Sequence, residues 1–110
     1  MNEEHVGHEV LGQYKWQDIA VDTERETVSR GRRQLKLTRH EYRLLVLLLE
    51  QEGLIVGRSE LAALGGGAER TVDSHICRIR RKLGPAARAI WTVRGRGWRF
   101  DAAAASIFVR

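Results

Sequence analysis

The hydrophobic residues between positions 14 and 37 alternate weakly with polar ones, a spacing typical of half-buried strands. The alternation indicates one strand at residues 14–21, with an irregularity near Asp18, and two more at residues 27–29 and 34–37. A turn around Arg30-Gly31-Arg32 joins the last two. Three short strands in succession predict an antiparallel meander.

From residue 38 onward the hydrophobic residues recur in the three- and four-residue steps of a helix. Thr38 and Glu41 form a T-x-x-E capping box, in which each side chain satisfies a free backbone N–H at a helix start. The helix that follows is apolar over much of its girth, which predicts a central place in the core. Gly53 is expected to end it, and Leu54-Ile55-Val56 is interpreted as a short apolar link.

Two further helices are predicted before residue 84. Gly57 can cap the first, and Gly65-Gly66-Gly67 ends it because glycine disfavours helical backbone. The second runs from about Arg70 to Leu83, and Gly84-Pro85 terminates it. One side of this third helix is a clean apolar stripe of Val72, Ile76, Ile79 and Leu83.

The last regular pattern is a pair of strands at residues 90–93 and 98–100, separated by Arg94-Gly95-Arg96-Gly97. Three helices followed by a hairpin form a helix-turn-helix with a wing. We therefore predict an α+β winged-helix fold over residues 13–101, with an N-terminal antiparallel sheet. Residues 1–12 are expected to be a tail or linker remnant and residues 102–110 a C-terminal tail.

Composition narrows the classes of protein that fit. A chain of 110 residues suits a single domain, and its one cysteine, Cys77, cannot form an internal disulfide, which favours a reducing, intracellular compartment. The longest aliphatic run, Leu44 to Leu49, is far shorter than the about 20 residues of a membrane span. The acidic, polar first residues do not resemble a secretory signal. We expect no membrane association.

The net charge of +5 is unevenly distributed. Residues 1–69 hold nine Lys or Arg and twelve Asp or Glu, whereas residues 70–100 hold nine Lys or Arg and a single acid, Asp73. The second block therefore carries a net charge of +8. Such a block is the electrostatic footprint of a polyanion-binding protein, although a solvated basic face would look the same.

The polar side of the third helix is what favours DNA as the polyanion. Thr71, Ser74, His75, Arg78, Arg81 and Lys82 lie off the apolar stripe and are expected to project outward. A helix fits the major groove, where arginine can make a bidentate contact with guanine. Arg94 and Arg96, at the glycine-rich hairpin tip, suit a narrow minor groove.

Four stretches of the chain together resemble the OmpR/PhoB-type winged-helix effector domain of bacterial response regulators, over residues 14–101. They are Leu37-Thr38-x-x-Glu41-Tyr42-x-Leu44-Leu45, Gly53-Leu54-Ile55-Val56-Gly57-Arg58-x-x-Leu61, Arg70-Thr71-Val72-Asp73-x-His75-Ile76-x-Arg78-Ile79-Arg80-Arg81-Lys82-Leu83 and Thr92-Val93-Arg94-Gly95-x-Gly97-Trp98-Arg99-Phe100. The resemblance implies a four-stranded N-terminal sheet, with the additional strand near residues 24–27 or within residues 14–23.

The resemblance also implies a role for each matching residue. Arg78, Ser74 and Thr71 would face bases in the major groove. Phosphates would be held by Arg70, His75, Arg80 and Arg81, and Arg58 would touch the DNA backbone. Thr92 and Trp98 would support phosphate contacts at the wing, where Arg94 would reach the minor groove. Members of the family bind tandem half-sites as head-to-tail dimers, recruit RNA polymerase and act in the cytoplasm, at the bacterial nucleoid.

The chain departs from the family pattern in four ways. It contains no receiver domain, so it is either an excised effector domain or a regulator controlled in another way. Residues 62–69 look shorter than the loop that often contacts RNA polymerase, and they lack Val-Trp-Gly. Cys77 stands where a polar or basic residue is common, and Trp98 replaces the usual tyrosine.

Other interpretations of the same residues remain open. Asp73 is expected to form a local ion pair or cap the helix, and Cys77 to be a half-buried small residue rather than a redox sensor. No metal set is seen among the histidines, no cofactor is implied, and no catalytic triad, nucleotide-binding fingerprint or carboxylate pair indicates an enzyme. The rival to DNA binding is a protein-interaction module that docks on another regulator or on a polymerase subunit.

Overall fold

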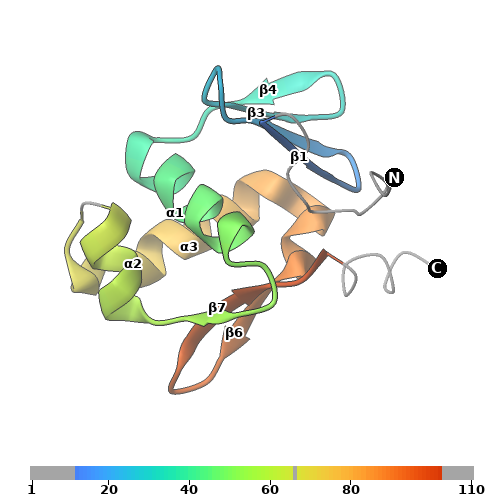
Figure 1. Ribbon diagram of the computed structural model, residues 1–110. Coiled ribbons are helices and arrows are strands. Elements are labelled where there is room, and N and C mark those ends of the chain that lie inside the picture. The colour runs from blue at the N-terminus through green and yellow to red at the C-terminus, as the bar shows by residue number, and fades with distance from the viewer. Residues whose placement is uncertain (1–11, 66, 103–110) are drawn as a thin grey trace.

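The computed structural model describes residues 12–65 and 67–102, and it confirms the α+β winged-helix fold. Two sheets lie on either side of a group of helices (Figure 1). The N-terminal sheet has the order β1-β2-β3-β4 and the C-terminal sheet the order β5-β7-β6. In chain order the elements are β1 (Gln13–Trp16), β2 (Ile19–Asp22), β3 (Thr27–Arg30), β4 (Arg33–Leu35), α1 (Arg39–Glu50), β5 (Ile55–Val56), α2 (Arg58–Gly65), α3 (Glu69–Leu83), the 3₁₀ helix η1 (Gly84–Ala89), β6 (Ile90–Val93) and β7 (Gly97–Phe100).

The N-terminal sheet has four strands, which corrects the single strand predicted at residues 14–21. The expected irregularity near Asp18 is a hairpin turn between β1 and β2, in which Gln17 takes a positive φ of 53°. The Asp18 carbonyl accepts a hydrogen bond from the Gly31 N–H, which ties the two turns at this end of the sheet together. The additional strand implied by the family resemblance therefore lies within residues 14–23.

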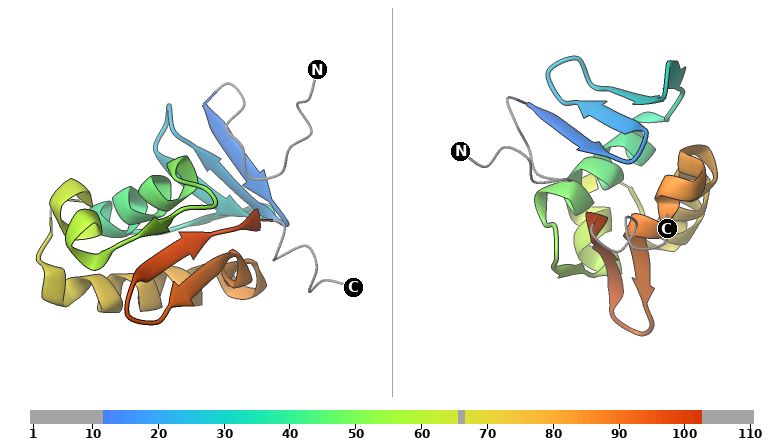
Figure 2. Two further views of the ribbon diagram at one scale, coloured as in Figure 1. Left: turned by 60° about the horizontal axis from the view of Figure 1, so that its bottom comes forward. Right: turned by 90° about the vertical axis from the view of Figure 1, so that its right-hand side faces the viewer.

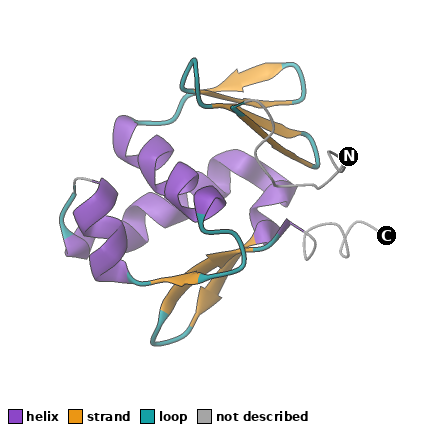
Figure 3. Ribbon diagram, in the orientation of Figure 1, coloured by secondary structure: helices purple, strands orange, loops and turns teal. Residues whose placement is uncertain are grey.

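The expected link at Leu54-Ile55-Val56 is also corrected, because Ile55 and Val56 form β5. This strand pairs with β7 in the register Ile55↔Arg99 and Val56↔Trp98, so it makes the wing a three-stranded sheet. Figure 3 shows this sheet and the N-terminal one at opposite ends of the molecule. A two-residue strand has no periodicity of its own, and its pairing depends on residues more than 40 positions later in the chain.

Helix α1 begins as its capping box predicts. The Thr38 hydroxyl accepts from the Glu41 N–H at 3.1 Å, and Glu41 accepts in return from the Thr38 N–H at 3.0 Å. Its apolar side packs on α2 and α3, which accounts for the buried Leu44, Leu45, Leu48 and Leu49. Helix α1 is therefore central to the core, as its apolar girth predicts.

One aromatic residue joins the N-terminal sheet to the C-terminal half of the chain. The Trp16 indole N–H donates to the Ala86 carbonyl at 3.1 Å, and its ring meets Phe100 edge-on with centroids 4.9 Å apart. An edge-to-face aromatic pair adds to the free energy of burial. These contacts hold the sheet, η1 and β7 in fixed relation.

The first and last described residues, Gly12 and Ala102, are both in contact with the packed part of the chain. The Gly12 carbonyl accepts from both the N–H and the hydroxyl of Thr23, and Ala102 is fully buried. The rest of the two expected tails, residues 1–11 and 103–110, lies outside the described residues. In the part that is described, no helix combines the length and the apolar character needed to cross a membrane.

Candidate nucleic-acid interface

Helix α3 has one buried and one exposed side, as its sequence pattern predicts. Val72, Ile76, Ile79 and Leu83 are each at most 1% exposed and pack into the core. The exposed side presents the cations Arg70, Arg78 and Arg81, together with Ser74 and Cys77. Since the aliphatic side chains fix the rotation of the helix, the guanidinium groups face solvent in one direction.

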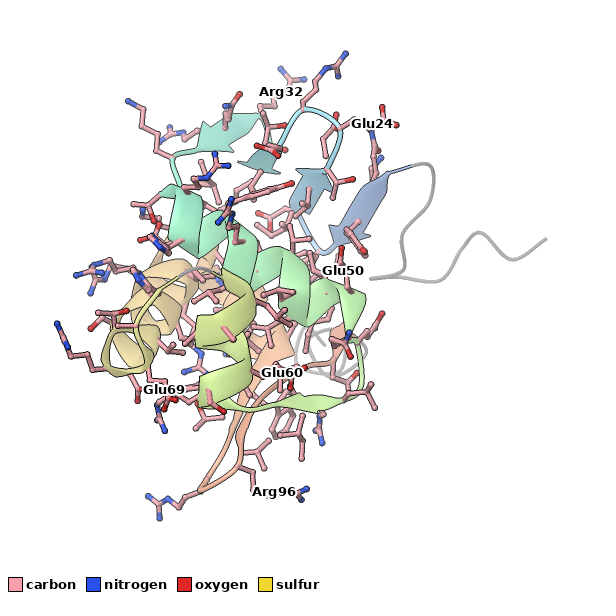
Figure 4. All side chains as sticks on the ribbon, turned by 60° about the vertical axis from the view of Figure 1, so that its left-hand side comes forward. Glu24, Arg32, Glu50, Glu60, Glu69 and Arg96 are labelled. Atoms are coloured by element: carbon pink, nitrogen blue, oxygen red, sulfur yellow. The ribbon has the colours of Figure 1, made fainter. Side chains whose placement is uncertain are left out.

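The wing lies alongside α3, as Figure 2 shows in its left-hand view. Arg94 and Arg96 are exposed on the turn between β6 and β7. Figure 4 places Arg96 at the far tip of this turn, pointing away from the body of the protein. Two exposed basic groups thus extend the positively charged surface beyond the helix.

Arg80 connects α3 to the wing. Its Nη2 donates to the Ile90 carbonyl at 2.9 Å and to the Thr92 hydroxyl at 2.7 Å. Burial lowers the pKa of Arg80, but a guanidinium remains charged at any physiological pH. Arg80 and Thr92 are both predicted to contact phosphates, and they are already hydrogen-bonded to each other across the junction between α3 and the wing.

Arg58, at the start of α2, lies where three elements meet. Its Nε and Nη2 donate to the two carboxylate oxygens of Asp73 on α3, at 2.8 Å and 3.2 Å. Its guanidinium carbon lies 5.3 Å from the ring centroid of Trp98 on β7. The hydrogen bond from Arg58 holds the pKa of Asp73 below its usual value. Asp73 thus forms an ion pair, but its partner lies on another helix, which corrects the expectation of a local pair.

Trp98 is almost completely buried, so its ring acts mainly as a platform beneath Arg58. A polar cleft of about 440 Å³ opens beside this cluster. It is bounded by the start of α2, the first turns of α3 and the wing turn, and Arg58, Asp73 and Arg96 line it. A charged groove of this kind suits a strand of phosphodiester backbone better than a small apolar ligand.

Lys82 and His75 do not project freely outward, which corrects the expectation for both. The Lys82 ammonium turns back to Glu41 Oε1 and to the Lys36 carbonyl, each at 2.7 Å. The His75 ring stacks on His40 of α1, with centroids 5.3 Å apart and planes 10° from parallel. Both residues are therefore held against α1 and its N-terminal end.

The environment of His75 favours its neutral form. Burial, the neighbouring His40 and the positive charge of Arg78 all lower the pKa of His75. Its Nδ1 is buried without a hydrogen-bond partner. The phosphate contact that the resemblance implies for His75 would need the other ring nitrogen, and it remains a prediction.

Two other polar residues of α3 differ in their surroundings. The Thr71 hydroxyl donates to the Ala68 carbonyl at 2.8 Å, in the first turn of the helix, so it is only partly available to a ligand. Cys77 is exposed, which corrects the expectation of a half-buried side chain. Within residues 12–65 and 67–102, no cluster of three or more His, Cys, Asp or Glu side chains could hold a metal ion.

Sequence reasoning missed the partners that hold these groups in place. Glu41 was recognisable from its capping box, but its burial and its ion pair with Lys82, 41 residues away, were not. The pairing of Arg58 with Asp73 spans 15 residues and has no local signal. Both pairs depend on how the helices pack, which residue spacing within a single helix does not reveal.

The family model described as "Transcriptional regulatory protein, C terminal" matches residues 31–100. The chain belongs to this family. It is 36% identical over 91 residues to the phosphate regulon transcriptional regulatory protein PhoB of Rhizobium meliloti, a match that covers 76% of this chain and 40% of PhoB. The chain thus spans well under half the length of this relative. OmpR/PhoB-type regulator domains are DNA-binding modules rather than enzymes.

Solved structures agree with the family assignment. The DNA-binding domain of the response regulator AdeR, in complex with an intercistronic region, has a TM-score of 0.68 and 32% identity, covering 78% of this chain and 95% of AdeR's. The DNA-binding domain of CpxR from E. coli has a TM-score of 0.74 and 29% identity, covering 84% of this chain and 98% of CpxR's. The described fold is therefore that of an OmpR/PhoB-type DNA-binding domain.

Proposed function

We propose that the chain binds double-stranded DNA sequence-specifically, as the effector part of a cytoplasmic transcriptional regulator. Helix α3 enters the major groove and the wing reaches the adjacent minor groove. The observation that carries this proposal is the pair of features on one surface: a helix anchored by a buried aliphatic stripe and exposing Arg70, Arg78 and Arg81, and a hairpin beside it with Arg94 and Arg96 at its turn.

The residues divide into two kinds of contact in this proposal. Arg78, Ser74 and Thr71 read bases, because a bidentate arginine or a hydroxyl can distinguish base edges in the major groove. The phosphate contacts come from α3, from the wing and from the start of α2, and these fix the register on the duplex. They are assigned to Arg58, Arg70, His75, Arg80, Arg81, Thr92, Arg94, Arg96 and Trp98, with Arg94 in the minor groove.

The experiment is selection of bound sequences from a random duplex pool, followed by affinity measurement on the selected site. Arg78→Ala should cost about 1–3 kcal/mol on that site and relax the base preference at one position, because it removes a base contact. Arg25→Ala is the matched control, an exposed arginine on the turn between β2 and β3 that pairs with Asp22. Binding that Arg78→Ala leaves unchanged would contradict the placement of α3 in the groove.

The alternative function is a protein-interaction module that docks on another regulator or on RNA polymerase. The observation that favours it is Leu64, which is 59% exposed at the end of α2, directly before the short connection to α3. A gel shift with genomic fragments, beside a pull-down from lysate, separates the two functions. Retention of particular fragments against competitor DNA supports the DNA-binding proposal, and a partner captured with no DNA retention supports the alternative.

The oligomeric state on DNA is part of the same proposal. Two copies bind tandem half-sites head to tail, and the selected sequences should therefore contain two direct repeats. Analytical ultracentrifugation with a two-repeat duplex should give two protein chains per duplex. A single half-site, or an inverted repeat, would contradict the head-to-tail arrangement.

A further inference from the structure

One acidic side chain, Asp73, lies among the basic residues of α3 and the wing. Asp73 is the only Asp or Glu among residues 70–100, where nine Lys or Arg produce a net charge of +8. It lies on α3 and lines the cleft beside the wing. A carboxylate in this position repels a phosphodiester backbone, so charge alone predicts that removing it strengthens binding to DNA.

Stability of the fold does not explain this acid. The side chains of Arg58 and Asp73 are 48% and 63% exposed, and ion pairs exposed to this degree contribute little to the free energy of unfolding. Both residues instead lie at the cleft that faces outward between α2, α3 and the wing. The pair therefore matters for what the cleft binds.

The geometry constrains Arg58 in two directions. The bidentate contact with Asp73 fixes the plane and direction of the guanidinium, and the Trp98 ring supports it from β7 at 5.3 Å. Among the described residues, Asp73 is the sole hydrogen-bond acceptor for Arg58, so the Nη1 donors remain available. An arginine held in this way loses less conformational freedom when it binds a phosphate.

We propose that Asp73 is a positioning residue for DNA binding: it holds Arg58 against Trp98 so that the free guanidinium donors meet a backbone phosphate in the cleft between α2, α3 and the wing. The inference rests on the proposed DNA-binding function. Asp73 itself touches no DNA, and it acts through Arg58 alone. The carboxylate therefore strengthens binding although its own charge opposes it.

The test uses two effects of Asp73 that change DNA affinity in opposite directions. Loss of its negative charge alone should strengthen binding, whereas loss of the positioning of Arg58 should weaken it. Affinity for the duplex selected by the wild-type chain is measured by fluorescence anisotropy for Asp73→Asn and for Glu69→Gln. Glu69 is exposed in the first turn of α3 and lines the same cleft, and among the described residues it acts on Arg58 through its charge without a hydrogen bond, so it is the matched acid. Asp73→Asn should weaken binding about two- to fivefold, the range that exposed ion pairs contribute, whereas Glu69→Gln should leave it unchanged or tighter.

Three further measurements separate positioning from a structural role. In an Arg58→Ala background, Asp73→Asn should no longer weaken binding. The log–log salt slope of Asp73→Asn should be shallower by up to about 0.9, because one phosphate contact is lost. Asp73→Glu, which keeps the carboxylate, should recover binding. Thermal unfolding checks that each variant is folded, and Asp73→Ser replaces Asp73→Asn if the latter is not.

Each remaining outcome counts against the inference. If Asp73→Asn binds as tightly as the wild-type chain or more tightly, or weakens binding equally with Arg58 removed, Asp73 is not positioning Arg58. If Glu69→Gln weakens binding as much as Asp73→Asn, the effect is not specific to the ion pair. Failure of the wild-type chain to retain any duplex overturns the proposed function as well, so the two failures are distinguishable.

Discussion

At the scale of single residues, Gly97 is the position where the wing has least room. Its φ of +140° is one that only glycine adopts readily, and a Cβ there would lie 2.1 Å from the Val56 carbonyl oxygen. The close approach is what lets β7 pair with β5. The backbone of the wing therefore depends on the absence of a side chain at this residue.

Gly97→Ala should destabilise the fold by about 2–4 kcal/mol, since backbone strain and a clash with neighbouring backbone act together. Gly95→Ala is the matched control, on the same turn with a φ of +77° but with no atom within 4 Å of the added Cβ. It should cost only about 1–2 kcal/mol, the penalty of left-handed backbone alone. Urea denaturation measures both, and equal losses would show that the contact with Val56 is unimportant.

Glu41 makes the stability of the fold depend on pH in the acid range. It is fully buried, and its burial alone would raise its pKa, but the hydrogen bonds from Lys82 and from the Thr38 N–H outweigh this and lower it. A carboxylate with a lowered folded-state pKa stabilises the fold above its unfolded-state pKa. That stabilisation is lost as the pH falls through the folded-state pKa.

Glu41→Gln should therefore cost about 1–3 kcal/mol at pH 7, through loss of a charged hydrogen bond. Its melting temperature should also fall less steeply than that of the wild-type chain between about pH 5 and pH 3, where the carboxylate is protonated. Thermal unfolding followed by circular dichroism over this range measures the difference. Parallel pH profiles for the two proteins would contradict the assignment to Glu41.

At the scale of elements, Arg80 joins α3 to β6. It spans from α3 to the Ile90 carbonyl and the Thr92 hydroxyl, and Thr92 lies on the strand that leads into the wing turn. The angle between helix and wing is therefore set by a side chain as well as by the core. A duplex that contacts both elements requires this angle to be fixed.

Arg80→Met keeps the aliphatic stem and removes the hydrogen bonds. It should destabilise the fold by about 1–2 kcal/mol and speed amide hydrogen exchange in β6 and β7, leaving β1–β4 unaffected. Arg81→Met, on the adjacent exposed position, is the control for loss of a positive charge. Exchange that rises equally in both variants would show that Arg80 does not anchor the wing.

At the scale of the whole molecule, the net positive charge is concentrated in the second part of the chain. Residues 12–69, which include the N-terminal sheet, hold nine Lys or Arg and nine Asp or Glu, whereas residues 70–100, which include α3 and the wing, carry a net charge of +8. Figure 4 shows Arg32, on the turn after β3, and Arg96, on the wing, at opposite ends of the protein. The end that carries the wing is the one suited to a polyanion.

Binding to the selected duplex should accordingly have a log–log salt slope of about −4 to −5 per chain, if about five phosphates are neutralised. Arg94→Gln should reduce its magnitude by about 0.9, whereas Arg32→Gln, at the far end, should leave it unchanged. Fluorescence anisotropy at several salt concentrations measures the slope. A slope near zero, or an equal effect of both variants, would contradict a DNA surface formed by α3 and the wing.

The sequence by itself determined the elements whose hydrogen bonds and packing are local. The capping box at Thr38 and Glu41, the apolar stripe of α3 and the glycine-rich wing turn each depend on residues a few positions apart, so their spacing predicts the backbone directly. The exposed cations of α3 followed from the same stripe, because the residues off a buried side face solvent. The motif resemblance supplied the fourth strand.

Only the tertiary structure decided which groups meet across elements. Strand β5, the turn at Gln17, and the partners of Arg58, Arg80 and Lys82 all depend on residues distant in the chain or on a single unusual φ. Helical or strand spacing fixes the side of an element on which a residue lies, but not what packs against that side. For this reason Lys82 and His75, expected outward, face α1, while Asp73 reaches the start of α2.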